Sequence, residues 1–237
     1  MKKIFNRLYK NTFHKFCEEI YEKIDNNEKT FIITANPETF MLSEKDDEMK
    51  TMLNDSKVIL VPDGIGVVKA AKMLGISVAE RIAGVDIAKK LLDYSNKKKL
   101  KVYLFGSKQE VIDSMKVVIK RYYNNINLVG ATNGYVDNKD LEFENIKKYC
   151  PDIVMVALGI PHQEKLIYKH LNEFDKGLFI GVGGSFDVLS GRKKRAPKIF
   201  IKFNLEWLYR ILCEPERIKR FWNSNVKFIF KVKKIAK

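Results

Sequence analysis

The sequence is poor in the residues and segments that define several classes of protein. It has three cysteines in 237 residues (Cys17, Cys150 and Cys213), and none of them forms a CxxC pair. This argues against a disulfide framework or a cysteine-rich zinc site and fits a reducing compartment. No apolar run reaches the roughly 20 residues that a membrane-spanning helix needs. The basic N-terminus also lacks the apolar stretch and cleavage site of a signal peptide, so we expect a cytosolic protein.

Motifs for metals and common cofactors are missing as well. The three histidines do not cluster: His14 is remote, and His162 and His170 are eight residues apart in one expected helix. No HExxH, Walker A or GxSxG motif occurs, and the segment GVGGSF at 181–186 has phenylalanine where a dinucleotide-binding motif needs its third glycine. We therefore expect neither a metal site nor a bound cofactor.

Positive charge is abundant, but it is unevenly distributed. Residues 192–237 hold 15 of the 44 basic residues and only three of the 29 acidic ones, so this tail carries +12 of the net charge of +15. Both tryptophans lie there too. Such an asymmetry indicates an anionic partner, either a membrane surface or a nucleic acid. Within the tail, residues 192–195 are consecutive cations, which anion binding and ordinary surface charge explain equally well.

The pattern of the tail favours a membrane over a nucleic acid. Across 198–237, aromatic and aliphatic residues alternate with cations at helical spacing, and Pro215 predicts the start of a second helix. Basic amphipathic helices with tryptophan and phenylalanine bind the bilayer interface. The same composition suits stacked bases and phosphates, but no RNP, KH or helix-turn-helix pattern is present. The apolar stripe could also pack on the protein's own core or on a second subunit.

Before the tail, short apolar runs alternate with longer amphipathic segments. The runs are largely continuous, as in strands buried on both faces, so the pattern predicts an α/β fold. We expect a Rossmann-like, mostly parallel sheet with helices on both faces in residues 1–191, and a basic helical appendage in 192–237. The predicted strands are 30–36, 57–63, 101–107, 126–132, 152–159 and 177–184, and the predicted helices are 37–55, 64–74, 84–96, 108–123, 139–149 and 161–174.

Glycine and small polar residues follow nearly every predicted strand. In open α/β sheets, ligands bind at the carboxyl ends of the strands, where glycine admits a ligand and the next helix offers free N–H groups. Strand-to-helix turns need glycine in any case, so one such turn says little. Several at one edge of a sheet favour a nucleotide or phosphate site.

Asp63 is the candidate general base. It follows the predicted strand 57–63 and precedes Gly64, so its carboxylate is expected at the ligand edge. An aspartate in this place suits a helix N-cap equally well. Thr34 and Asn36 end the preceding strand and are expected beside Asp63, although Thr-x-Asn-Pro is also a common turn and cap sequence.

Taken together and in order, these segments resemble the WecG/TagA/CpsF family of bacterial glycosyltransferases. The resemblance covers about residues 30–235 and is carried by TANP at 34–37, PDGIGV at 62–67, ERIAGVD at 80–86, FGS at 105–107, GY at 134–135, LGIPHQE at 158–164, and 183–197 from GGSFD to RAP.

The resemblance implies an inverting, metal-independent glycosyltransferase. It implies transfer of N-acetylmannosamine from UDP to undecaprenyl-diphospho-N-acetylglucosamine through a β-1,4 link, in the synthesis of teichoic acid or another cell-surface polysaccharide. It also implies a peripheral position on the inner face of the cell membrane and favours self-association. Another UDP-hexose or a uronic acid donor is the alternative within the family, and a nucleic-acid-binding module is the alternative outside it.

The resemblance also assigns residues to roles. Asp63 would be the base, and Thr34 and Asn36 would line the site. Arginines of the appendage would meet the lipid diphosphate, with Arg210, Arg217 and Arg220 as candidates. The candidates for donor binding are Arg81, Gly106, Ser107, Tyr135, Gly159, Gln163, Gly183, Gly184 and Asp187, of which Tyr135 and Asp187 would meet the uracil.

Overall fold

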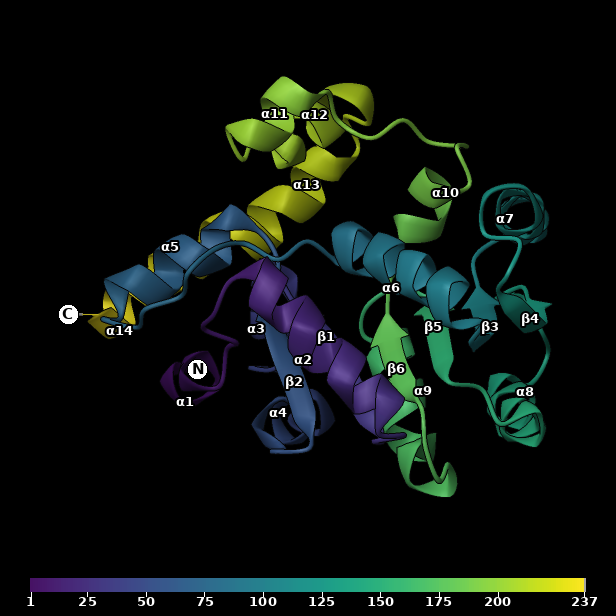
Figure 1. Ribbon diagram of the computed structural model, residues 1–237. Coiled ribbons are helices and arrows are strands. Elements are labelled where there is room, and N and C mark those ends of the chain that lie inside the picture. Colours follow the sequence, from purple (N-terminus) through teal and green to yellow (C-terminus); the bar gives the residue numbers. More distant parts are fainter. Residues whose placement is uncertain (237) are drawn as a thin grey trace.

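The computed structural model describes residues 1–236, apart from the side chains of Arg217 and Arg220. Its centre is a six-stranded sheet in the order β2-β1-β6-β5-β3-β4, in which every pairing is parallel (Figure 1). This confirms the predicted α/β fold, and each predicted strand is present. The strands are β1 (Thr30–Ala35), β2 (Val58–Pro62), β3 (Lys101–Gly106), β4 (Asn127–Thr132), β5 (Ile153–Ala157) and β6 (Leu178–Gly181).

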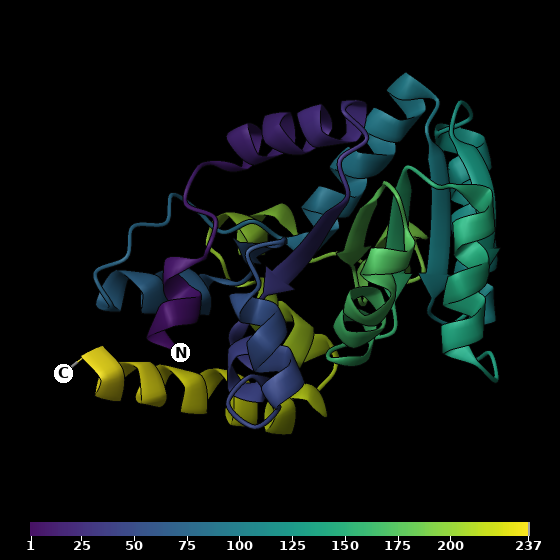
Figure 2. The ribbon, with the colours of Figure 1, turned by 90° about the horizontal axis from the view of Figure 1, so that it is seen from below.

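Helices cover both faces of the sheet, because successive side chains of a strand point to opposite faces. Along β1, for example, Phe31 and Ile33 enter one core and Ile32 enters the other. One face carries α2 (Phe13–Asp25), α6 (Gly84–Lys98), α7 (Gln109–Tyr122) and α10 (Ser185–Leu189). The other carries α1 (Lys2–Asn6), α3 (Pro37–Leu42), α4 (Asp47–Asn54), α8 (Lys139–Ile146) with a 3-10 turn at Lys147–Tyr149, and α9 (His162–His170) with one at Leu171–Glu173 (Figure 2).

The expectation of one helix over 37–55 was wrong. The chain instead forms α3 and α4, separated by 43–46. The Asp46 side chain accepts a hydrogen bond from the Met49 N–H at 3.1 Å and so begins a new helix. The sequence analysis also did not anticipate α1 and α2, which precede the first strand.

The tail runs across the carboxyl edge of the sheet and then turns back onto the core. Its helices are α11 (Lys198–Lys202), α12 (Glu206–Cys213), α13 (Arg217–Phe221), a π-helical turn at Trp222–Val226, and α14 (Lys227–Ala236). As predicted, a new helix follows Pro215, but it is the third of the tail, because the chain before it forms both α11 and α12. The last helix, α14, lies beside α5 (Ile65–Met73) (Figure 1). None of the helices described within residues 1–236 is long and apolar enough to cross a membrane.

One aromatic side chain fastens α14 to the core. Phe228 is 0% exposed, and its ring lies 6.0 Å from that of Phe5 and 5.5 Å from that of Phe40. Val232, one helical turn further on, is buried in the same core. Part of the tail's apolar stripe therefore packs on the protein itself.

Replacing Phe228 should show how strongly this anchor stabilises the fold. Phe228→Ala should lower the free energy of unfolding by about 3 to 5 kcal/mol, because it leaves a cavity in a closed core. Phe230→Ala is the matched control, since Phe230 lies on the same helix and is 66% exposed. Urea unfolding of both variants measures the difference, and equal losses would contradict the anchoring role of Phe228.

Candidate functional site

The carboxyl ends of β1 and β2 bring Thr34 and Asp63 together. The two strands are paired so that Ala35 faces Pro62, and the Asp63 N–H donates to the Ala35 carbonyl at 3.0 Å. Gly84 begins α6 directly against both side chains. A Cβ atom at Gly84 would lie 3.3 Å from Thr34 Cγ2 and 3.8 Å from Asp63 Oδ2. The close approach of α6 to this sheet edge therefore favours a small residue at position 84.

Asp63 does not cap the helix that follows it. Gly64 occupies the N-cap of α5 with a φ of 98°, and Asp63 Oδ2 instead accepts a weak hydrogen bond of 3.5 Å from the Gly84 N–H. Burial raises the pKa of the Asp63 carboxyl, and the positive charges of Arg81 and Arg210 offset part of this increase. A carboxylate with a raised pKa is a stronger base than an exposed one, so the environment suits proton abstraction.

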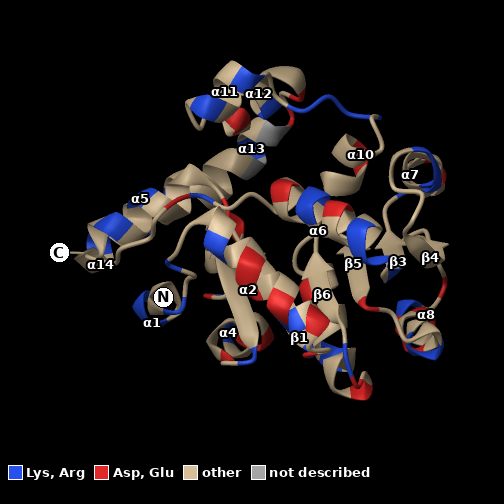
Figure 3. Ribbon diagram, in the orientation of Figure 1, with Lys and Arg blue, Asp and Glu red and all other residues tan. Residues whose placement is uncertain are grey.

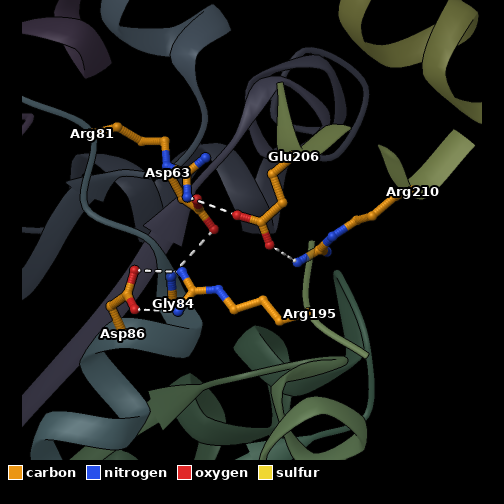
Figure 4. A network of polar contacts seen from close by, with 7 residues as sticks. All are labelled: Asp63, Arg81, Gly84, Asp86, Arg195, Glu206 and Arg210. Carbon is orange, nitrogen blue, oxygen red and sulfur yellow. Dashed lines mark hydrogen bonds and ion pairs between the residues drawn. The ribbon is translucent and has the colours of Figure 1, made fainter. Parts of the chain in front are cut away.

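A buried glutamate from the tail joins the cations on either side of Asp63. Glu206 is 4% exposed, and its carboxylate accepts from Arg81 at 2.9 Å and from Arg210 at 2.7 Å (Figure 4). Burial alone would raise the pKa of Glu206, but the two guanidinium groups outweigh this effect and lower it. Glu206 therefore stays ionised and links the core residue Arg81 to the tail.

A second ion pair ties the basic segment before the tail helices to the core. Arg195 donates to both oxygens of Asp86, at 2.6 and 2.7 Å, and Asp86 lies in the first turn of α6. This two-point geometry is the strongest that arginine forms with a carboxylate. Figure 3 shows the basic segment passing from α10 to α11. Two charged contacts thus hold the tail over the edge where Asp63 lies.

Gln163 connects the turns that follow β5 and β6. It is 2% exposed, and its Oε1 accepts from the N–H groups of Gly159 and Gly183, both at 3.1 Å. Its Nε2 donates to Glu164 at 2.7 Å. In a neighbouring turn, the Ser107 N–H donates to the Ala157 carbonyl at 2.7 Å. The N–H groups of Gly159, Gly183 and Ser107 are thus already bonded to protein acceptors.

Five further predicted residues take no part in the hydrogen bonds described above: Asn36, Gly106, Tyr135, Gly184 and Asp187. Asn36 accepts from the Thr39 N–H at 3.1 Å and caps α3. Tyr135 is 74% exposed beyond β4, and Asp187 lies in α10. Within the described part of the chain, no hydrogen bond or ring contact joins Tyr135 to Asp187, so their shared uracil role stays a prediction. Gly106 and Gly184 lie in the turns after β3 and β6, and the side chains of Arg217 and Arg220 lie outside the described residues.

Three acidic residues at or near the site were not selected from the sequence. Asp86 and Glu206 form the ion pairs described above. Glu164 is buried next to Gln163, and its Oε2 has no hydrogen-bond partner among the described residues. One feature of the sequence could have pointed to Glu206, because it is one of only three acidic residues in a strongly basic tail. Burial raises the pKa of Glu164 from its ordinary value of 4.5 to about 7.

One group of side chains has ligand atoms close enough to hold a metal, and it lies away from Asp63. Among the described residues, Glu144, His170 and Glu173 bring such atoms within 4.8 Å of one another. Both ring nitrogens of His170 are already engaged, by Asp140 at 2.7 Å and by Glu173 at 2.8 Å. This group lies at the far end of α9, so it is remote from the site.

Comparisons with known proteins show which family the chain resembles. The family described as "Glycosyl transferase WecG/TagA/CpsF family" matches residues 3–237. A relative from Bacillus subtilis (strain 168) is 43% identical over 209 residues, which cover 88% of this chain and 80% of the relative. One from Staphylococcus aureus (strain NCTC 8325 / PS 47) is 37% identical over 205 residues, or 86% and 80% of the two chains. Both are named N-acetylglucosaminyldiphosphoundecaprenol N-acetyl-beta-D-mannosaminyltransferase.

The raised pKa of Glu164 predicts a pH dependence of stability. Between pH 4.5 and about 7 the unfolded chain has released this proton and the folded protein still holds it. The free energy of unfolding therefore falls as the pH rises through this window, by about 3 kcal/mol at most. Glu164→Gln removes the titration and keeps an oxygen for Gln163. Measured by urea unfolding, the free energy of unfolding of the variant should rise by this amount relative to that of the wild type between pH 4.5 and 7.5.

The control for this experiment is Glu110→Gln, because Glu110 is exposed on α7. Its difference from the wild type should stay constant over the same pH range. A constant difference for Glu164→Gln as well would show that Glu164 does not titrate in this window.

Proposed function

Because the chain belongs to the WecG/TagA/CpsF family of glycosyl transferases, as its motifs predicted, we propose that it transfers N-acetylmannosamine from a UDP donor to undecaprenyl-diphospho-N-acetylglucosamine. The relatives with this activity in their name are 37% and 43% identical to the chain over more than four fifths of its length. The observation that carries the proposal is the position of Asp63, a carboxylate of raised pKa at the ligand edge with arginines around it.

Asp63 is the general base of the proposed reaction. It takes the proton of the acceptor hydroxyl as that oxygen attacks C1 of the donor sugar. The new glycosidic bond forms as the bond from C1 to the UDP oxygen breaks, which inverts the anomeric centre. Burial suits Asp63 to this task, because it increases the proton affinity of the carboxylate. Thr34 adjoins Asp63 and lines the same edge.

Arginines supply the positive charge that the leaving group needs. UDP gains negative charge as the bond to C1 breaks, and fixed cations in a partly dehydrated site stabilise such charge strongly. Arg81 comes from the core, and Arg210 comes from α12 of the tail. The tail thus contributes to the proposed active site, where Arg210 would meet the diphosphate of the lipid acceptor, as the resemblance implies, or that of the donor.

The tail also provides the surface for the membrane that contains the lipid acceptor. Its exposed large apolar side chains are Ile199, Phe203, Trp207, Leu212, Ile218, Trp222, Phe230 and Ile235. They accompany a net charge of +12 in residues 192–237. Exposed aromatics among cations bind an anionic bilayer interface, where each cation adds about 1 kcal/mol. We infer that the tail docks the enzyme on the anionic membrane surface.

An assay of UDP release tests the proposed reaction. The wild type should release UDP from UDP-N-acetylmannosamine when a polyprenyl-diphospho-N-acetylglucosamine analogue is added, without added metal. Asp63→Asn should lower this rate by about 100-fold or more, since it removes the general base. Calorimetric titration should show that the variant still binds UDP. Undiminished turnover in Asp63→Asn would exclude Asp63 as the base, and the lack of acceptor-dependent release by the wild type would exclude the reaction.

Vesicle flotation tests the membrane surface. The double variant Phe203→Glu with Trp222→Glu should bind vesicles containing phosphatidylglycerol several-fold less than the wild type, because charge replaces two exposed aromatics. The matched control is Val117→Glu with Tyr122→Glu, which makes the same charge change at two exposed positions on α7. An equal loss of binding in both double variants would mean that net charge alone drives the association.

A further inference from the structure

Glu206 places a negative charge between two cations that face the reacting edge. Its two oxygens bind different partners: Oε2 accepts from Arg81 of the core and Oε1 from Arg210 of the tail. Both pairs are short, at 2.9 and 2.7 Å, and the glutamate itself is buried (Figure 4). The diphosphate of a bound substrate would likewise be an anionic group that contacts both arginines next to Asp63.

The fixed charges of this site are balanced before any ligand enters. Arg81, Arg195 and Arg210 face the carboxylates of Asp63, Asp86 and Glu206. A diphosphate diester adds about two negative charges, and like charges repel strongly in a partly dehydrated site. A diphosphate that binds these arginines therefore competes with the carboxylates that already pair with them.

Glu206 is the carboxylate best placed to leave. Asp86 is held by both of its oxygens to Arg195, and Asp63 follows directly from a central strand. Glu206 instead belongs to α12, a tail helix that is joined to the core through the segment 190–197, the ion pairs themselves and, beyond α13, the anchored helix α14. Only one N–H group of each arginine is used by Glu206, so the same arginines have further donors for an incoming anion.

We propose that Glu206 is an internal anion that holds the diphosphate subsite in the free protein, and that the substrate diphosphate displaces it to bridge Arg81 and Arg210. The inference rests on the proposed function for the identity of the ligand, which is the diphosphate of the sugar nucleotide or of the lipid. In the exchange, one bridging anion replaces another. The tail consequently stays over the site when substrate is bound, and Arg81, whose side chain is 13% exposed, keeps a counter-charge.

Inorganic diphosphate is the probe that tests the exchange, because it contains the bridging group and nothing else. Its affinity is measured by calorimetric titration of the full-length protein at a fixed ionic strength. Glu206→Gln should bind it about tenfold more tightly than the wild type, since diphosphate no longer competes with a charge-assisted hydrogen bond. Equal or weaker binding would overturn the proposal and would mean that Glu206 orients the arginines for the ligand.

The matched control is Glu214→Gln. Glu214 is an acid of the same tail and pairs with Lys193 at 2.8 Å. Its replacement changes the net charge by the same amount, so it measures the general electrostatic effect. Diphosphate affinity should change less than twofold in this variant. A tenfold gain in both variants would attribute the effect to net charge and overturn the exchange.

A second substitution keeps the test decisive if Glu206→Gln folds poorly. Glu206→Asp retains the charge but is one methylene shorter, so it cannot reach both arginines equally. Its affinity for diphosphate should lie between those of the wild type and Glu206→Gln, and an unchanged affinity would contradict the exchange.

Further titrations identify the source of the diphosphate. In Glu206→Gln, tighter binding of UDP assigns the subsite to the donor, and tighter binding of farnesyl diphosphate assigns it to the lipid. Failure of the proposed function is visible separately, as the absence of acceptor-dependent UDP release by the wild type. A tighter complex of Glu206→Gln with inorganic diphosphate would support the exchange even then.

Discussion

The arrangement of the site depends on the ion pairs that Glu206 forms with Arg81 and Arg210. Arg81 belongs to the α/β core, and Glu206 and Arg210 belong to the tail, so this contact brings the two parts of the chain together beside Asp63. Buried charges are costly unless they are paired, and here each one has a partner of the opposite sign. The pairing holds Arg81 and Arg210 beside Asp63, where the proposed substrate brings its phosphates.

The tail is attached at both of its ends and exposes apolar side chains between them. Arg195 and Glu206 hold its beginning to the core through ion pairs, and Phe228 holds its last helix through aromatic packing. Trp222 and Phe203 lie between these attachments and are exposed. One segment therefore lies beside Asp63 through Glu206 and Arg210 and also exposes basic and aromatic side chains, and the proposed transfer to a lipid-linked acceptor would use both.

Several features could be predicted because they depend on local sequence. Continuous apolar runs predicted all six strands, since only strands covered on both faces tolerate such runs. The sequence analysis missed the break between α3 and α4. Asp46 is an ordinary polar residue in the sequence, and only the structure shows that its carboxylate caps α4 by accepting from the Met49 N–H. The sequence left two roles open for Asp63, a general base or a helix cap. The structure shows that its carboxylate accepts from the Gly84 N–H and does not cap the helix that follows Asp63.

The sequence by itself determined the α/β class, the carboxyl-edge position of Asp63 and Thr34, the basic tail and, through an ordered set of motifs, the family. These follow from periodicity, from the direction of parallel strands and from composition, which need no knowledge of distant contacts. The tertiary structure alone decided that Glu206 joins Arg81, that Arg195 pairs with Asp86, and that Gln163 binds two glycine turns. These partners lie between 4 and 125 residues apart in the chain, and an ion pair depends on where the fold places its charges, which no local pattern encodes.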